Sequence, residues 1–474
     1  MKTPLLFILA IFAIPVTYSQ TIDNRLDSLL TETGLPVLYM TTDSGEEPKG
    51  NAVYPPSGAW GVGLTGNEYQ TGELTIKLDG NIIYSSGAYK KGTGGARIKL
   101  RGNTSAIGNG KKPYKIKLSK KSDLLFRGYS FFKCKEWVLL PAHDTKLVKF
   151  ITGIAVAECV GMEWEPDYEV VSLVLNGDYK GMYLLVDAIE KGPSRCNVDY
   201  TGFIIEDDAY WWNEEKYFKG NILPYPVGFT FKYPDNEDVT DELLENIKQY
   251  MLEFEELLVS KGNVGSMIDM GSFASWLLAH DILGTGDSGG TNRYLYKYDF
   301  TSPTAKTTNS SLLKMGPLWD FDAVFKNEGR WASIHNVDYS FYFPYLLDID
   351  EFKNEYLKVW NEMSPELYSI IMSELNTVLK EKGNRIDLCK ELDYARWYQP
   401  NNEFKDDVAL VDDWLTRRME WLNENINEEY ATIKEIENDG DETFDGIYSI
   451  WGTEVDRILL PGIYIVNGRK VMVK

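Results

Sequence analysis

The order in which strand-like and helix-like patterns follow one another constrains the fold of this chain more than any other sequence feature. Short segments that alternate apolar and polar residues between Gly-rich turns fill the region from about 35 to 120, and this alternation is typical of strands. Past residue 238 the apolar residues recur with the period of an amphipathic helix, and one small β return lies between 293 and 319. Strands followed by helices predict an α+β fold.

Two further signals accompany the short strands of the N-terminal half. Asn176-Gly177 stands between two apolar arms and predicts a hairpin over 170–186. Thr145 to Val160 carries its apolar residues on one face and predicts a helix. The strands themselves are expected at 36–40, 74–78, 97–100, 114–118 and 137–140.

Capping residues predict where the later helices begin. Thr240 precedes Asp241 and Glu242 and an apolar stripe, which is the pattern of a capped helix. Ser364 followed by Pro365 indicates the cap and the first position of a separate helix. The other helices are expected at 272–283, 350–363, 365–382 and 404–425.

The first 19 residues have the pattern of a secretory signal. A lysine at position 2 precedes an apolar run from Pro4 to Val16, and small residues at 17 and 19 predict cleavage after Ser19. The protein is therefore expected to be exported, to the periplasm, the cell surface or the medium. No other stretch is apolar for long enough to predict a transmembrane segment.

The C-terminal end combines an acidic linker with a small β unit. Residues 428–445 are acidic and interrupted by glycine, and Asn467-Gly468 within 446–474 predicts a hairpin. The pattern Gly462-Ile-Tyr through Asn467-Gly-Arg-Lys-Val resembles the C-terminal sorting segments of proteins exported by type IX secretion. A small β addition without a targeting role is the alternative.

Composition narrows the possible partners. The chain has a net charge of -22, which argues against nucleic acid as a partner because phosphates would be repelled, and a substrate with a basic tail would suit such an acidic surface. Only three histidines are present, so a zinc site built from histidine is not expected. The four cysteines lack metal-ligand spacing and are interpreted as buried small residues.

Three polar residues between 287 and 320 have a spacing that suggests chemistry. Asp287 is followed by Asn292, then by a strand-like segment, and a second such segment ends at Asp320. This is the order of a kinase catalytic loop and metal-binding loop, in which carboxylate and amide oxygens hold magnesium. Spacing alone leaves open that these residues only form turns.

Five motifs in a fixed order resemble the CotH-type (spore-coat protein H) atypical kinase family. They extend from about 36 to 326 and are Arg101-Gly-Asn-Thr-Ser with Lys111-Lys-Pro-Tyr-Lys-Ile-Lys-Leu, Trp137-Val-Leu-Leu, Asn176-Gly-Asp-Tyr-Lys-Gly-Met-Tyr, Phe203-Ile-Ile-Glu, and Gly316-Pro-Leu-Trp-Asp-Phe-Asp. The resemblance implies an atypical protein-kinase-like fold with a β-rich N-lobe and a helical C-lobe. It also implies transfer of phosphate from ATP to Ser/Thr hydroxyls of a protein.

The resemblance implies roles for particular residues. Asp287 takes the position of the catalytic base. Asp320 and Asn292 take the position of the Mg²⁺ (or Mn²⁺) ligands, and Asp322 is a second candidate ligand because it follows two residues later. The lobes implied are 20–200 and 201–427.

The basic side chain that would contact the nucleotide phosphates is less sharply defined by the sequence. On an extended segment Lys115 and Lys117 share one face, so either side chain can reach a phosphate site; we favour Lys115, with Lys117 and Arg101 as rivals. An exposed basic strand face is the alternative. Asp187 is a further candidate for a nucleotide contact, and it stands where family members commonly carry Glu. Lys149 stands where Arg is usual, which removes a bidentate donor.

Two other functions are compatible with these residues. A kinase-like fold without turnover would make the protein a surface binding or adhesion protein, with glycan contact through Tyr210-Trp211-Trp212 as a weaker possibility. A nucleotidyl transferase would use the same metal site with the nucleotide reversed. His280-Asp281 is interpreted as a capping or packing pair at a helix end rather than a catalytic one.

Overall fold

A computed structural model gives the structure of this protein. The residues it describes are 19–108, 110–223, 228–285, 291–300, 311–325, 333–336, 341–398, 402–430, 447–449, 462–466 and 469–473. The chain divides into two compact units, residues 1–424 and residues 425–474, and each is described by itself. Within the described ranges no helix is both long and apolar enough to cross a membrane.

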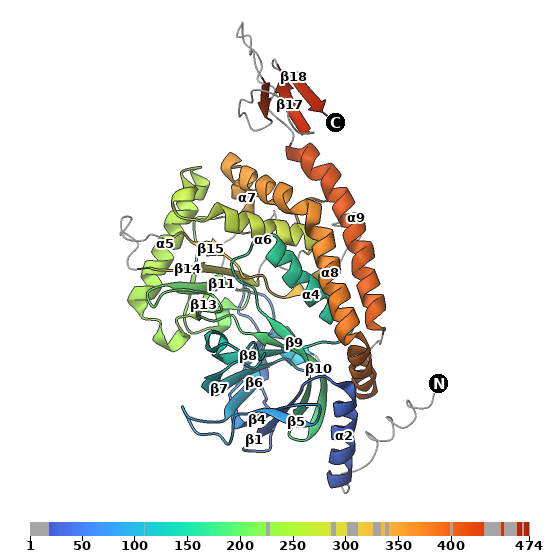
Figure 1. Ribbon diagram of the computed structural model, residues 1–474. Coiled ribbons are helices and arrows are strands. Elements are labelled where there is room, and N and C mark those ends of the chain that lie inside the picture. The colour runs from blue at the N-terminus through green and yellow to red at the C-terminus, as the bar shows by residue number, and fades with distance from the viewer. Residues whose placement is uncertain are drawn as a thin grey trace. The chain divides into compact units, whose positions relative to one another are not determined.

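Seven strands of the first unit close into a barrel (Figure 1). Their order is β1-β9-β10-β8-β7-β6-β4, and pairing of β4 with β1 closes the ring, while β5 adds to β4 outside it. Only the β1–β9 pair within the ring is parallel. The strands are β1 (Val37–Thr42), β4 (Gln70–Leu78), β5 (Asn81–Ser85), β6 (Ala96–Leu100), β7 (Tyr114–Ser122), β8 (Cys134–Pro141), β9 (Tyr168–Leu175) and β10 (Asp178–Asp187).

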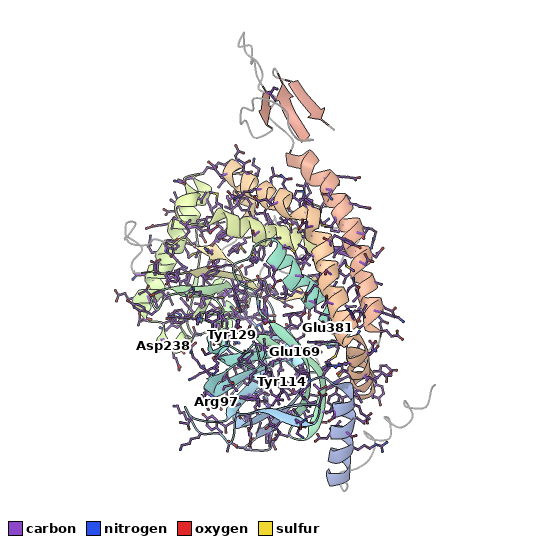
Figure 2. All side chains as sticks on the ribbon, viewed as in Figure 1. Arg97, Tyr114, Tyr129, Glu169, Asp238 and Glu381 are labelled. Carbon is purple, nitrogen blue, oxygen red and sulfur yellow. The ribbon has the colours of Figure 1, made fainter. Side chains whose placement is uncertain are left out.

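Strict alternation along β7 decides which of its side chains enter the barrel. Tyr114, Ile116 and Leu118 are buried in the same core cluster as Trp137 of β8. Successive side chains of a strand point to opposite faces, so Lys115 and Lys117 lie together on the other face, as predicted. Figure 2 shows Arg97 and Tyr114 on the barrel, where β6 and β7 pair with each other.

A second, antiparallel sheet has the order β12-β13-β11-β14-β15. It lies between the barrel and helices α5 and α6 in Figure 1. Pairing of β11 with β13 and β14 joins segments far apart in the sequence, and the buried side chains of Phe203, Ile204 and Ile205 explain why β11 is central. The strands are β11 (Phe203–Asp207), β12 (Tyr217–Lys219), β13 (Gly228–Tyr233), β14 (Arg293–Lys297) and β15 (Lys314–Met315); a separate hairpin consists of β2 (Asn51–Val53) and β3 (Gly63–Thr65).

The helices of the first unit follow the predicted caps in most places. Thr240 Oγ1 accepts a hydrogen bond from the Leu243 amide at 3.1 Å, which confirms the predicted cap of α5. Asp269 caps α6 in the same way. The α-helices are α2 (Ser19–Thr33), α3 (Thr104–Gly108), α4 (Lys146–Cys159), α5 (Asp241–Val259), α6 (Met270–Leu283), α7 (Phe343–Leu346), α8 (Asp350–Trp397) and α9 (Phe404–Tyr430). Single 3₁₀ turns lie at Ser130–Phe132, Trp211–Asn213, Asn236–Asp238, Val264–Ser266 and Phe321–Ala323.

The predicted break at Ser364-Pro365 is wrong. Helix α8 runs without interruption over 48 residues and contains Pro365. Buried residues continue along α8 on both sides of the proline, from Trp360 and Met363 to Leu367 and Ile371. Packing of this continuous apolar stripe outweighs the one backbone hydrogen bond that proline removes.

The second unit contains a small antiparallel sheet. Its strands are β16 (Ile447–Ser449), β17 (Gly462–Val466) and β18 (Arg469–Val473), in that order. Pairing of Val466 with Arg469 confirms the hairpin predicted around 467–468. Of the predicted acidic linker, 428–430 belong to α9 and 431–445 lie outside the described residues, as do residues 1–18 of the predicted signal.

The prediction of an α+β fold is confirmed, with strands concentrated before residue 240 and helices after it. Closure of the N-terminal strands into a barrel was not predicted. The four cysteines are free, and three of them are buried, as interpreted from the sequence.

Candidate functional site

Asn292 and Asp320 come together at one edge of the second sheet. Asn292 directly precedes β14 and Asp320 follows β15, and antiparallel pairing of these strands places the two side chains beside each other. The Asn292 side-chain amide donates to the Asp320 carboxylate at 3.2 Å. Both residues have positive φ angles, 60° and 61°, a conformation that non-glycine residues adopt rarely and that gathers at functional sites.

The donor set at this point suits a hard divalent cation. Carboxylate and amide oxygens are the ligands that Mg²⁺ prefers, and both side chains supply them. Among the described residues no group of three or more His, Cys, Asp or Glu side chains is arranged to hold a metal ion. Asp287, the predicted catalytic base, lies outside the described residues.

Helix α4 holds the segment that follows Asp320. Lys146 pairs with the Asp322 carboxylate, and Lys149 Nζ donates to the Asp322 backbone oxygen at 3.1 Å. The Phe321 ring packs edge-on against Phe150, with ring centroids 5.7 Å apart. Asp322 as a metal ligand stays a prediction, and its carboxylate in this structure faces a lysine of α4.

Lys115 and Lys117 converge on Glu136 of the neighbouring strand β8. Lys115 pairs with one carboxylate oxygen, and Lys117 Nζ lies 2.6 Å from the other. Burial by itself raises the pKa of Glu136, but the charges and hydrogen bonds of the two lysines outweigh burial and lower it to about 2. Sequence reasoning missed Glu136; its alternation on β8, directly across from Lys117, was the available signal.

Arg101 connects the barrel with the metal loop. Its guanidinium lies over the Trp319 ring, 4.8 Å from the centroid, next to Asp320 in the sequence. Glu206 of β11 has its carboxylate 2.6 Å from Lys232 Nζ. Burial raises the pKa of Glu206 to about 7, and Lys232 opposes that rise. The Glu206–Lys232 pair is a second feature that sequence reasoning did not assign.

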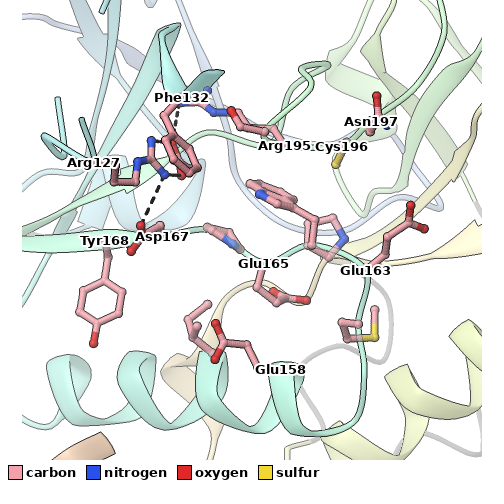
Figure 3. Close-up of a pocket in the computed structure, with 18 of the residues that line it drawn as sticks. Arg127, Phe132, Glu158, Glu163, Glu165, Asp167, Tyr168, Arg195, Cys196 and Asn197 are labelled. Carbon is pink, nitrogen blue, oxygen red and sulfur yellow. Dashed lines mark hydrogen bonds and ion pairs between the residues drawn. The ribbon is translucent and has the colours of Figure 1, made fainter. Parts of the chain in front are cut away.

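Asp187 of β10 lies across from Trp137 of β8, which neighbours Glu136 in the sequence. Its carboxylate accepts from Arg127 Nη1 at 2.7 Å and from Arg195 Nη2 at 2.8 Å, and it is 1% exposed. Asp187 lines a cavity to which Lys115, Lys117 and Asp320 do not contribute (Figure 3). Its role as a nucleotide contact stays a prediction.

Asp281 has a structural environment. The buried carboxylate accepts from the Tyr356 hydroxyl at 2.9 Å and from the Asn336 amide at 3.0 Å, and it lies 2.7 Å from His335. Its backbone oxygen accepts from Arg418 of α9. These contacts agree with the interpretation of His280-Asp281 as a packing pair, because Asp281 ties α6 to α8, α9 and residues 333–336.

The aromatic residues at 210–212 lie beside the β2–β3 hairpin. Trp60, 60% exposed, has its ring centroid 6.2 Å from that of Tyr210, and Trp212 Nε1 donates to the Trp60 backbone oxygen at 3.2 Å. Most of this cluster serves to hold the hairpin. Glycan contact stays a prediction.

The candidate site lies within the stretch of the chain that matches a known family. A sequence model described as CotH kinase protein matches residues 98–422, which include Arg101, Lys115, Lys117, Asn292 and Asp320. No curated protein matches the chain. Because the match covers more than half of its length, the chain belongs to the CotH kinase protein family.

Proposed function

We propose that this protein is a kinase that transfers the terminal phosphate of Mg-ATP to Ser/Thr hydroxyls of a protein. The observation that carries the proposal is the contact between Asn292 and Asp320 inside a family match described as a kinase. A divalent cation bound there would neutralise phosphate charge. Asn292 and Asp320 would hold it through their side-chain oxygens.

Basic side chains of the barrel would bind the nucleotide phosphates in this proposal. In kinases a strand lysine is oriented by a glutamate ion pair, and Lys115 has such a partner in Glu136. The glutamate comes from strand β8 here and not from helix α4, so the lysine is oriented within the barrel itself. Arg101, whose guanidinium lies over the Trp319 ring, is a third cation of the barrel and contacts the segment that leads to Asp320.

The acceptor and the place of action belong to the same proposal. Asp287 would accept the hydroxyl proton of the protein substrate as general base. The charge of -22 would attract a substrate with a basic tail. The signal-like start and the sorting-like C-terminal tail support action outside the cytoplasm, where export would deliver the protein.

The test measures nucleotide binding and phosphate transfer separately. ATP with Mg²⁺ is expected to raise the melting temperature of the wild type by several degrees, and Asp320→Ala is expected to abolish this rise. Asp406→Ala, an exposed aspartate of α9, is the matched control and should retain the wild-type shift. A shift that survives in Asp320→Ala contradicts the assigned metal site.

Labelled ATP then distinguishes the reactions. Incorporation of label from the γ-position into a Ser/Thr-containing protein supports phosphate transfer. Incorporation from the α-position identifies a nucleotidyl transferase instead. Binding without any incorporation from either position would leave a surface binding protein as the function.

A further inference from the structure

A cavity lies beside the candidate kinase site, and Gly316 and Pro317, which precede Asp320, are part of its lining. It has a volume of about 610 Å³ and is bounded by α4, by the connection from α4 to β9, and by residues 193–197 (Figure 3). Neither Asn292, Asp320, Lys115 nor Lys117 lines it. A volume of this size is in the range of small-molecule sites.

Carboxylates dominate the polar lining of this cavity. Asp187 is neutralised by Arg127 and Arg195, and Glu163 lies 2.5 Å from Lys314. The remaining ones include Glu158 of α4, Glu165 of the connection and Glu374 of α8, and these three have no lysine or arginine partner among the described residues. Glu158 and Glu374 are exposed, so the lining includes solvent-accessible carboxyl groups that have no cationic partner among the described residues.

Glu165 is the most constrained of the three. Its Oε1 accepts from the Leu318 amide at 3.0 Å, while Oε2 is buried and has no hydrogen-bond partner. Burial raises the pKa of Glu165 well above its usual range, with a further rise from the negative charge of Glu158. Figure 3 shows Glu158 on α4 below the carboxyl group of Glu165. A cation bound between Glu158 and Glu165 would offset the free-energy cost of an ionised Glu165 carboxylate in this buried position.

The shape of the lining distinguishes between kinds of cation. Within the described residues no three carboxylates are gathered closely enough to hold one metal ion. The acidic groups are instead distributed around a wall that also contains Trp164, Tyr168 and Phe132. Aromatic rings attract ammonium groups and accommodate methylene chains. An elongated organic cation with several charges fits this arrangement better than a metal ion.

We propose that this cavity is a binding site for a small aliphatic polyamine, whose ammonium groups pair with Glu158, Glu165 and Glu374 while its methylene groups lie against Trp164 and Tyr168. The proposal does not depend on the kinase activity. It concerns a site that shares only Asp187 with the residues predicted for nucleotide and metal.

The test is calorimetric titration of the full chain with spermidine at low ionic strength. We expect one saturable site, and the double variant Glu158→Gln/Glu374→Gln should weaken binding by about tenfold or more, because it removes two charge-assisted contacts. The matched control is Glu362→Gln/Glu366→Gln, which removes two exposed carboxylates of α8 that do not line the cavity. This control should bind spermidine as the wild type does.

Several results would overturn the proposal. Equal weakening in both double variants would mean that spermidine binds the acidic surface at large, and absence of a saturable phase would exclude the site. Uncharged 1,8-octanediol binding as tightly as spermidine would exclude recognition of ammonium groups. Hydrogen exchange of the wild type gives an independent measurement: spermidine should protect residues 158–168 and 193–197, and protection confined to other segments contradicts the site.

Discussion

At the scale of single residues, the acidic side chains of this protein differ in what surrounds them. Glu136 is held ionised by two lysines, whereas Glu255 of α5 is buried with the Tyr342 hydroxyl as a 3.3 Å donor to one oxygen. Burial raises the pKa of Glu255 to about 7, and the Tyr342 donor and a backbone hydrogen bond reduce that rise. The two glutamates therefore give opposite dependences of stability on pH.

Glu136→Gln is expected to lower the free energy of unfolding above pH 4.5 by up to about 3 kcal/mol. The pKa of Glu136 is about 2 in the folded protein and starts from 4.5, so its ionised form stabilises the fold above pH 4.5. That contribution is lost as pH falls through the window from 4.5 to 2. Urea unfolding of the variant and the wild type across this window checks the prediction. Glu366→Gln is the control. The prediction would be contradicted if the difference in unfolding free energy between the wild type and Glu136→Gln did not shrink toward low pH.

Glu255→Gln is expected to raise the free energy of unfolding, the opposite of the effect expected for Glu136→Gln. The folded pKa of about 7 lies above the ordinary 4.5, so ionisation of Glu255 destabilises the fold progressively as pH rises between these values. The variant should therefore be more stable than the wild type at pH 8 by about 1–3 kcal/mol, with a smaller difference at pH 5. Denaturant titrations at the two pH values measure this. Glu256→Gln, exposed on the same helix, should show no such gain.

At the scale of elements, helix α8 is fastened to the barrel by a buried ion pair. Lys111 precedes β7, and its ammonium lies 2.7 Å from Asp393 of α8, with side-chain exposures of 0% and 6%. Asp393 also accepts from the Met182 amide of β10 at 2.9 Å. The close approach of Asp393 to β10 requires glycine at position 181, because a Cβ there would lie 2.0 Å from the Asp393 carboxylate. Lys111, the first residue of the motif at 111–118, thus has a structural role.

Asp393→Ala is expected to destabilise the protein by about 3–5 kcal/mol, because it leaves the Lys111 ammonium buried without a counter-charge. Thermal and urea unfolding measure the loss. Adding Lys111→Met to this variant should recover a large part of it, since the uncompensated charge is then gone. A double variant as unstable as Asp393→Ala would show that packing, and not charge, accounts for the effect.

Elements whose signals are local were predictable. The Asn176-Gly177 hairpin, the capped helix at Thr240 and the strand alternation at 114–118 depend on residues within a few positions of one another. The separate helix predicted at Pro365 failed because a local signal competed with burial along the whole of α8. Propensity and capping are weak terms beside the packing of a long apolar stripe.

At the scale of the whole molecule, residues 425–474 form a unit of their own. Truncation after Tyr430 keeps helix α9 complete and removes the small sheet of β16, β17 and β18. We expect the calorimetric melting temperature of the remaining unit to change by no more than about 1–2 °C, since domains with their own cores unfold largely independently. A fall of 10 °C or more would show that the tail stabilises the first unit.

Some contacts of the candidate site were predictable from the sequence, and others were not. Asn292 and Asp320 were predicted as partners from the spacing of a resembled family, and the structure places their side chains 3.2 Å apart. Lys115 and Lys117 were predicted to share a face, and they do. The lysine partner Glu136 and the two arginines that enclose Asp187 were not predicted, because each is a contact across strands or loops.

Local sequence patterns were enough to predict the α+β class and most elements, because side-chain periodicity, caps and turn residues act over short distances. The residues proposed for the metal and the nucleotide were also named from the sequence. Contacts between distant parts of the chain set the closure of the barrel through β1 and the continuity of α8. They also set the pairing of Lys115 and Lys117 with Glu136 and the position of the acidic cavity beside Gly316 and Pro317, which precede Asp320. These depend on which distant surfaces bury one another, and that free energy belongs to the whole fold.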